Sequence, residues 1–146
     1  MFEQCILQRY CDFLTSSDNQ FGFKKKSGCV HAIYALKCTA DYYVSHNSTV
    51  YLCALDLSKA FDKMKHHALF LKLMKNHIPV SLLRLLEIWF ESSSTCVKWG
   101  NCFSDFFKLT CGIRQGGVLS PHLFAVYIDS VIEKIRASEF GCVINW

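Results

Sequence analysis

Two aspartates, Asp56 and Asp62, lie within the short sequence LCALDLSKAFDK, residues 52–63. Asp56 follows directly on the apolar run Val50–Leu55, which is typical of a strand buried on both faces. In open α/β sheets, chemistry is usually placed at the ends of strands and in the loops that follow them. Asp56 is therefore a candidate catalytic residue. The alternative is that Asp56 caps the turn after it, because aspartate is a favoured cap residue.

A second stretch with chemical potential begins at Gly112 and reads GIRQGGVLSPHLFAVYID. Its glycines allow the backbone to come close to a ligand or a base pair, and Arg114 and Gln115 supply polar side chains between them. A glycine-rich turn before a helix, with Ser120 as cap and Pro121 in the first turn, would explain the glycines and the Ser-Pro pair. It does not explain the Arg-Gln pair.

A third stretch concentrates positive charge, because Lys24, Lys25 and Lys26 follow Phe21 and Phe23. Lysines next to aromatic side chains can meet a phosphate backbone, where they serve both charge and stacking. A solvated basic turn explains the same residues equally well. The formal net charge of +4 permits a nucleic-acid partner without proving one.

Apolar side chains at helical spacing predict most of the elements that would position these stretches. The expected helices cover residues 2–14, 29–44, 69–77, 79–92 and 120–135. On the last of these, the buried face is expected to hold Phe124, Tyr127, Ile128, Val131 and Ile135.

Strands are expected in a different part of the pattern. Besides Val50–Leu55, the segments Thr95–Trp99 and Phe103–Leu109 flank Gly100-Asn101 and predict a β-hairpin. Residues 141–144 are interpreted as the start of a further strand. Together these elements indicate an α/β (α+β) domain in which helices pack on a small antiparallel sheet.

The composition is that of one globular domain, with 146 residues of which 51% are hydrophobic and 19% charged. The nine cysteines are odd in number and include no CxxC pair, so we expect reduced, mostly buried thiols in an intracellular, not secreted, protein. Whether it would be nuclear or cytoplasmic stays open. His66, His67 and His77 are expected at helix surfaces or caps, not as metal ligands. No apolar run is long enough to predict a membrane span.

LDLSKAFDKM and GIRQGGVLSPHLFAVYID together resemble two blocks of the reverse transcriptases of non-LTR (LINE-like) retrotransposons. QFGFKKKSGCVHAI resembles the fingers-region block that precedes them in that family. The resemblance covers nearly the whole chain, with the three blocks in the family's order. It implies a partial right-hand polymerase fold, fingers-like over about residues 1–47 and palm-like over about residues 48–146.

The chemistry that the resemblance implies is two-metal nucleotidyl transfer, in which carboxylates hold two Mg²⁺ ions about 4 Å apart. Asp56 would be the catalytic residue that provides the first metal-binding carboxylate, and the backbone carbonyl of Leu57 would bind the second ion. Phe61 would pack under the sugar of the incoming deoxynucleotide, where its ring would collide with a 2′-hydroxyl. No metal role is carried onto Asp62.

The same resemblance implies contacts with nucleic acid. Gln115, Gly116 and Gly117 would lie against the nascent base pair, and Arg114 would lie near a template or nucleotide phosphate. Lys24–Lys26 would face the template. An RNA template, a DNA primer and deoxynucleotides are the implied partners, together with the remainder of the polymerase.

One departure from the family's pattern bears on activity. The family places its other two metal carboxylates in an aromatic-x-Asp-Asp hairpin, whereas the later acids Asp129, Glu133 and Glu139 form no such pair. One carboxylate cannot hold two Mg²⁺ ions that each need near-octahedral oxygen ligands. We therefore expect that this chain does not polymerise by itself. The alternative function is a non-catalytic module that binds RNA or a partner. An unpaired Asp56 strand would also make the isolated chain poorly soluble.

Overall fold

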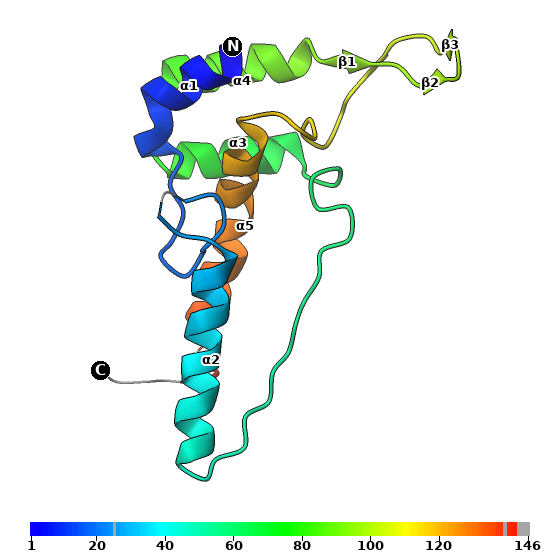
Figure 1. The fold of residues 1–146 in the computed structure, drawn as a ribbon. Coiled ribbons are helices and arrows are strands. Elements are labelled where there is room, and N and C mark those ends of the chain that lie inside the picture. Colours follow the sequence, from blue (N-terminus) through cyan, green and yellow to red (C-terminus); the bar gives the residue numbers. More distant parts are fainter. Residues whose placement is uncertain (25, 139, 143–146) are drawn as a thin grey trace. The chain divides into compact units, whose positions relative to one another are not determined.

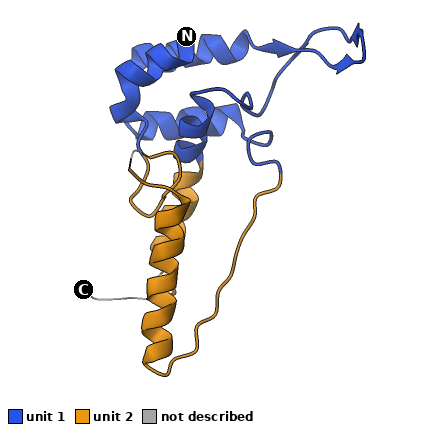
Figure 2. Cartoon of the chain, viewed as in Figure 1, with its two compact units in different colours: residues 1–15, 59–127 blue, residues 16–58, 128–146 orange. Residues whose placement is uncertain are grey.

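The computed structural model describes residues 1–24, 26–138 and 140–142 (Figure 1). The chain forms two compact units, which Figure 2 shows in different colours. Unit 1 comprises residues 1–15 and 59–127, and unit 2 comprises residues 16–58 and 128–146. Each unit is a set of residues that mainly contact one another. The units do not test the division into a fingers-like and a palm-like part, which stays a prediction.

Unit 1 is built mainly from helices, and their positions confirm the apolar periodicity of the sequence. Leucines one helical turn apart, such as Leu69 with Leu73 and Leu82 with Leu86, are fully buried and define the inward faces. The helices are α1 (Phe2–Tyr10) with a 3-10 turn (Cys11–Phe13), α3 (His66–Lys75), α4 (Val80–Glu91) and the first part of α5 (Ser120–Arg136).

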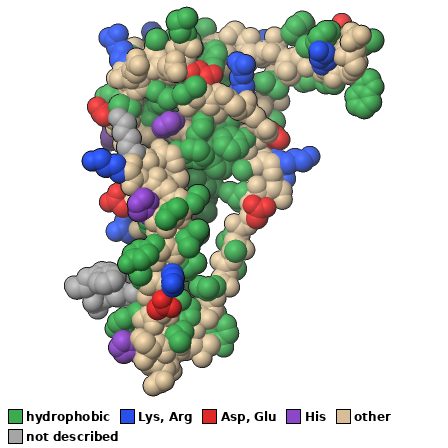
Figure 3. Space-filling view, in the orientation of Figure 1, with side chains coloured by type: hydrophobic (Ala, Val, Ile, Leu, Met, Phe, Trp, Pro, Cys, Tyr) green, Lys and Arg blue, Asp and Glu red, His purple; other side chains and the backbone are tan. Residues whose placement is uncertain are grey.

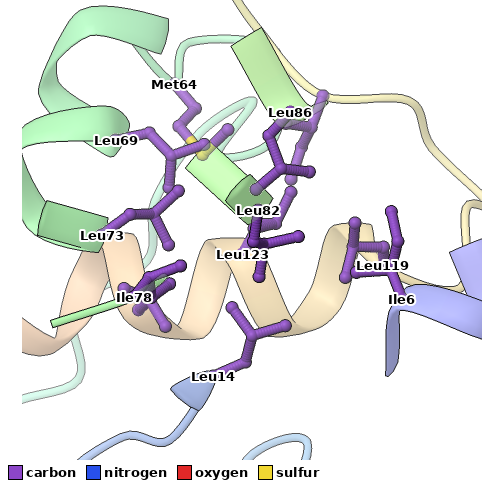
Figure 4. Close-up of a cluster of buried hydrophobic side chains, with 12 residues drawn as sticks. Ile6, Leu14, Met64, Leu69, Leu73, Ile78, Leu82, Leu86, Leu119 and Leu123 are labelled. Carbon is purple, nitrogen blue, oxygen red and sulfur yellow. The ribbon is translucent and has the colours of Figure 1, made fainter. Parts of the chain in front are cut away.

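The core of unit 1 joins these helices, as Figure 4 shows. Met64, Leu119 and Leu123 are also almost completely buried in it. Each leucine of this kind contributes about 1.5–3 kcal/mol by leaving water. The cluster consists of Ile6, Leu14, Met64, Leu69, Leu73, Ile78, Leu82, Leu86, Ile113, Leu119, Leu123 and Val126.

The predicted hairpin is confirmed in unit 1, although its strands are short. Strands β2 (Lys98–Trp99) and β3 (Cys102–Phe103) pair antiparallel across Gly100, whose φ of 59° suits a tight turn. Strand β1 (Ser94–Thr95) pairs antiparallel with β4 (Phe107–Lys108) at the base. Cys111 then forms an isolated bridge with Lys65, which brings the following loop back to the start of α3.

Unit 2 contains α2 (Cys29–Ser45) and the last part of α5. None of the residues of α2 is buried, and Val30, Ile33 and Val44 are each more than 60% exposed. Figure 3 shows hydrophobic side chains at the surface along this helix. The tail strand expected over residues 141–144 includes residues 143 and 144, which lie outside the described part of the chain.

The prediction of a buried strand over Val50–Leu55 is wrong. Residues 49–57 have no regular secondary structure, and Tyr51, Leu52 and Leu55 are 91%, 65% and 81% exposed. A strand is stable only when a neighbouring strand accepts and donates its backbone hydrogen bonds. Among the described residues no segment pairs with this one, so the apolar run stays extended and exposed.

One expectation about burial is wrong and a second is right only in part. Of the nine cysteines, Cys38 and Cys96 are half-buried and the others are exposed, and each is a free thiol. On the expected face of α5, Phe124 and Tyr127 are half-buried and pack against the core, whereas Val131 and Ile135 are exposed. Periodicity indicates which side chains share a face, but it does not say where along the helix the packing ends. Within the described residues, no helix is long and apolar enough to cross a membrane.

Candidate functional site

The side chains of Asp62, Arg114 and Gln115 line one open cleft of unit 1, with a volume of about 750 Å³. The Gln115 amide nitrogen donates a hydrogen bond of 2.8 Å to Asp62 Oδ1. This bond orients the amide, with its nitrogen toward Asp62 and its oxygen on the other side. The sequence placed no role on Asp62, and residues 53 positions apart gave no signal that they would meet.

The start of the loop that carries Gln115 is hydrogen-bonded to the segment from Phe61 to Met64. The amide of Gly112 donates to the Met64 carbonyl oxygen at 2.7 Å, and the amide of Ile113 donates to the Phe61 carbonyl oxygen at 3.1 Å. Gly112 has a φ of 81°, and a Cβ there would lie 2.9 Å from the Asp62 carbonyl oxygen. Glycine is therefore required for this close approach.

His66 is a second contact that sequence reasoning missed. It was expected at a helix surface or cap, but its ring is half-buried, with Nε2 2.6 Å from the Gly112 carbonyl oxygen. The ring also lies edge-on to Phe90, with centroids 4.6 Å apart. His66 therefore fixes the start of the loop from the side of α3.

The loop ends at the start of α5, where Glu3 reaches it from α1. Glu3 Oε2 accepts a hydrogen bond of 2.9 Å from the amide of Leu119. Gly117 leaves room for this carboxylate, because a Cβ there would lie 2.9 Å from Glu3 Oε2. Ser120 was expected to cap the helix; it is instead the first helical residue, and its hydroxyl donates to the Arg114 carbonyl oxygen at 2.6 Å.

Phe61 lies at the edge of the core of unit 1. Its half-buried ring packs against Phe124, with centroids 4.8 Å apart and an angle of 31° between the planes. Together with the bond that its carbonyl oxygen accepts from Ile113, this packing fixes the backbone and the ring of Phe61. The ring is therefore held next to the loop and is not a mobile surface side chain.

Asp56 and Leu57 belong to unit 2. Both are exposed in the segment without regular structure. The described part of the chain contains no group of three or more His, Cys, Asp or Glu residues that could hold a metal ion. The residues present therefore do not fit a complete site for two divalent ions.

The lysines of the basic stretch differ in their surroundings. Lys24 Nζ donates to the Ser17 carbonyl oxygen and lies 3.7 Å from Asp18 Oδ1, so Lys24 is engaged within unit 2. Lys26 is exposed, with a φ of 62°. Lys25 lies outside the described residues.

A carboxylate of α5 holds the turn that precedes the basic stretch in unit 2. Asp129 accepts hydrogen bonds from the Ser17 amide at 2.9 and 3.1 Å, from the Ser17 hydroxyl at 2.8 Å and from the Gln20 side chain at 3.3 Å. Charge-assisted bonds of this kind are about twice as strong as neutral ones. Asp129 therefore has a structural role, which could not be predicted because its partners Ser17 and Gln20 are more than 100 positions away in the chain.

A shifted pKa lies on α2, at Tyr34. A hydrogen bond with the Cys38 side chain, followed by charge repulsion from the Cys38 thiolate, raises the pKa of Tyr34 above its ordinary value of 10.0. Both residues are one helical turn apart on the surface of unit 2.

Comparison with known proteins gives a consistent result. The family model described as reverse transcriptase (RNA-dependent DNA polymerase) matches residues 2–145. Among curated proteins, the chain is 26% identical over 126 residues to the retrovirus-related Pol polyprotein from type-2 retrotransposable element R2DM of Drosophila melanogaster. It is 28% identical over 134 residues to the RNA-directed DNA polymerase from mobile element jockey of Drosophila funebris. It is 25% identical over 127 residues to a reverse transcriptase-like protein of Chlamydomonas reinhardtii.

These matches cover most of this chain and a small part of each relative. They span 86%, 87% and 87% of the chain, but only 12%, 14% and 32% of the three relatives in the order given. The family match extends over all three blocks, at residues 20–33, 55–64 and 112–129. The predicted resemblance to reverse transcriptases of non-LTR retrotransposons is confirmed.

Proposed function

Because this chain belongs to the reverse transcriptase family, we propose that it carries nucleotide- and template-facing residues of an RNA-directed DNA polymerase of a non-LTR retrotransposon. The observation that carries this proposal is the cleft in which Asp62, Arg114 and Gln115 meet, next to the glycine loop. A cleft of this size, with a few convergent polar groups, suits a small ligand such as a nucleotide.

The loop residues would act on the nucleotide and its base pair. Gly116 and Gly117 have no side chains, so a base pair could approach their backbone closely. Gln115, oriented by Asp62, would offer its amide to the same ligand. The exposed guanidinium of Arg114 would bind a phosphate, for which its planar fork of donors is well suited.

Phe61 would select deoxynucleotides. A ring that excludes a 2′-hydroxyl must stay in position when a ribonucleotide enters the site. The packing of Phe61 on Phe124 supplies that rigidity in unit 1. Selection of this kind rests on an unfavourable contact with the wrong substrate.

Asp56 and the Leu57 carbonyl would contribute to metal binding in the intact enzyme, in which the family implies a divalent metal, proposed as Mg²⁺. Oxygen atoms of this kind are the ligands that Mg²⁺ prefers. One exposed carboxylate does not make a complete site, so we expect no polymerisation by this chain alone.

Lys26 is the best-supported contact to a template phosphate among the three lysines. Its side chain is exposed, whereas Lys24 is held by Ser17 and Asp18. Lys25 keeps the same proposed role on the resemblance alone. An RNA template annealed to a DNA primer is the ligand that these charges would meet.

A second candidate function is a non-catalytic module that binds RNA or a partner. It is favoured by the exposure of Asp56 and by the lack of a metal-binding cluster among the described residues. The two functions share the basic contacts and differ in whether Asp56 acts in synthesis.

Binding of a labelled RNA–DNA template–primer, followed by fluorescence anisotropy at several salt concentrations, tests both functions. We expect the logarithm of the affinity to fall linearly with the logarithm of salt, and Lys26→Ala to reduce that slope by about one. Lys37→Ala, on the exposed surface of α2, is the control and should leave the slope unchanged. Binding that does not depend on salt concentration would contradict the proposed template contact and the RNA-binding form of the second function.

Primer extension with RNA template, deoxynucleotides and Mg²⁺ tests the expected inactivity of this chain by itself. The chain should give no synthesis above an Asp56→Ala variant. Synthesis above that control would show a working active site and contradict the expected inactivity.

A further inference from the structure

Two carboxylates that are not proposed to bind a metal ion contact the loop from Gly112 to Leu119 in unit 1. Asp62 meets the loop near its start, and Glu3 meets it at its end. Neither is assigned a role by the resemblance to known polymerases. Asp62 contacts the Gln115 side chain and Glu3 contacts the Leu119 backbone amide, so the two contacts lie on either side of Gly116.

The contact with Asp62 acts on a side chain. Gln115 and Asp62 are both exposed in the cleft, so their hydrogen bond contributes little to stability. Its effect is on orientation, because the carboxylate accepts only from the nitrogen of the amide. The oxygen of Gln115 is thereby directed away from Asp62 and toward a different partner.

The contact with Glu3 acts on the backbone. Glu3 is half-buried, and its carboxylate accepts the Leu119 amide immediately before the first residue of α5. A negative charge is favoured at this end of a helix, where the backbone amides point outward. Gly117 permits the approach, since any side chain there would meet the carboxylate.

We propose that Glu3 and Asp62 are positioning residues that hold the Gly112–Leu119 loop so that Gln115 and Gly116 present one fixed surface to a nucleotide. This inference rests on the proposed function of the loop. It adds the prediction that α1, far from the loop in sequence, determines how well a nucleotide is bound.

The test uses the full chain labelled with ¹⁵N and the variants Glu3→Ala and Asp62→Ala. Hydrogen exchange of the Leu119 amide should accelerate at least about tenfold in Glu3→Ala, the equivalent of about 1.4 kcal/mol. The side-chain amide signals of Gln115 should shift in Asp62→Ala. Glu3→Gln and Asp62→Asn each keep an acceptor oxygen. The Leu119 exchange rate and the Gln115 side-chain signals in these variants should therefore stay close to those of the parent chain.

The functional readout is the affinity for a fluorescent deoxynucleoside triphosphate in the presence of Mg²⁺ and template–primer. Each alanine variant should weaken that affinity about fivefold and leave the affinity for template–primer unchanged. Glu91→Ala, an exposed carboxylate on α4, is the matched control and should change neither. Far-UV circular dichroism shows whether each variant is folded.

The outcomes distinguish this inference from the proposed function. Unchanged Leu119 exchange and Gln115 signals in folded alanine variants would overturn the positioning role. Faster Leu119 exchange and shifted Gln115 signals, combined with an unchanged nucleotide affinity, would also overturn the positioning role. The proposed function would then still stand. If the parent chain bound template–primer and no nucleotide, the positioning role would fail and the template-binding part of the proposed function would remain.

Discussion

At the scale of single residues, Gly112 is the position where backbone geometry restricts the sequence most. Its φ of 81° is unfavourable for any residue with a side chain, and a Cβ would collide with the Asp62 carbonyl oxygen. Gly116 has the same φ of 81° but no atom within 4 Å of the corresponding Cβ position. Substitutions at Gly112 and Gly116 therefore separate the cost of a strained backbone from the cost of a steric collision.

Gly112→Ala should destabilise unit 1 by more than Gly116→Ala does. The conformational cost alone is about 1–3 kcal/mol at each position, and the collision at Gly112 should add at least about 1 kcal/mol. Urea unfolding followed by tryptophan fluorescence measures both free energies. Equal losses in the two variants would mean that the approach of Gly112 to Asp62 is not as close as described.

The candidate site was only partly predictable at this scale. Arg114, Gln115 and Gly116 could be selected because their residue types match a known block. Glu3 and Asp62 could not be predicted, because their roles depend on contacts with residues 116 and 53 positions away. A single sequence carries no record of such distances.

At the scale of elements, the helices were predictable and the strand before Asp56 was not. Helices satisfy their own backbone hydrogen bonds, so apolar periodicity locates both ends of α4 to within about one residue, although α3 begins three residues before its expected start. A strand depends on a partner elsewhere in the chain, and the composition of residues 50–55 says nothing about whether that partner is present. The short hairpin was predictable because its two strands are neighbours in sequence.

The amides of residues 49–57 should exchange with solvent rapidly. This segment has no regular structure and is mostly exposed, whereas α4 has its amides bonded within a helix whose Leu82 and Leu86 are fully buried. Hydrogen exchange followed by mass spectrometry compares the two segments in one sample. Protection of residues 50–55 comparable to that of α4 would restore the buried strand that the sequence predicts.

At the scale of the whole molecule, much apolar surface is exposed, and α2 carries a large share of it in unit 2. Val30, Ile33 and Tyr34 are 77%, 65% and 69% exposed on this helix. Exposed apolar surface of this extent favours binding of hydrophobic dyes and self-association. The poor solubility expected from the sequence stays a prediction, now located on this helix as well as on residues 50–55.

Replacing Ile33 by lysine should lower the fluorescence of the dye ANS and reduce light scattering by the protein. The free energy of unfolding should change by less than about 0.5 kcal/mol, because the side chain makes no buried contact. Ala35→Lys adds the same charge to the same helix and removes little apolar surface. Equal effects of the two substitutions would show that charge, and not exposed apolar surface, governs association.

If this chain holds working parts of a reverse transcriptase, those parts should function within a complete polymerase, which a segment exchange measures. Residues of this chain would replace the matched 134-residue segment in the Drosophila funebris jockey polymerase, and primer extension on an RNA template would be measured in chimeras that retain template–primer binding. We predict synthesis that Asp56→Ala abolishes and Glu3→Ala reduces. A folded, template-binding chimera whose synthesis does not change with Asp56→Ala would contradict the account.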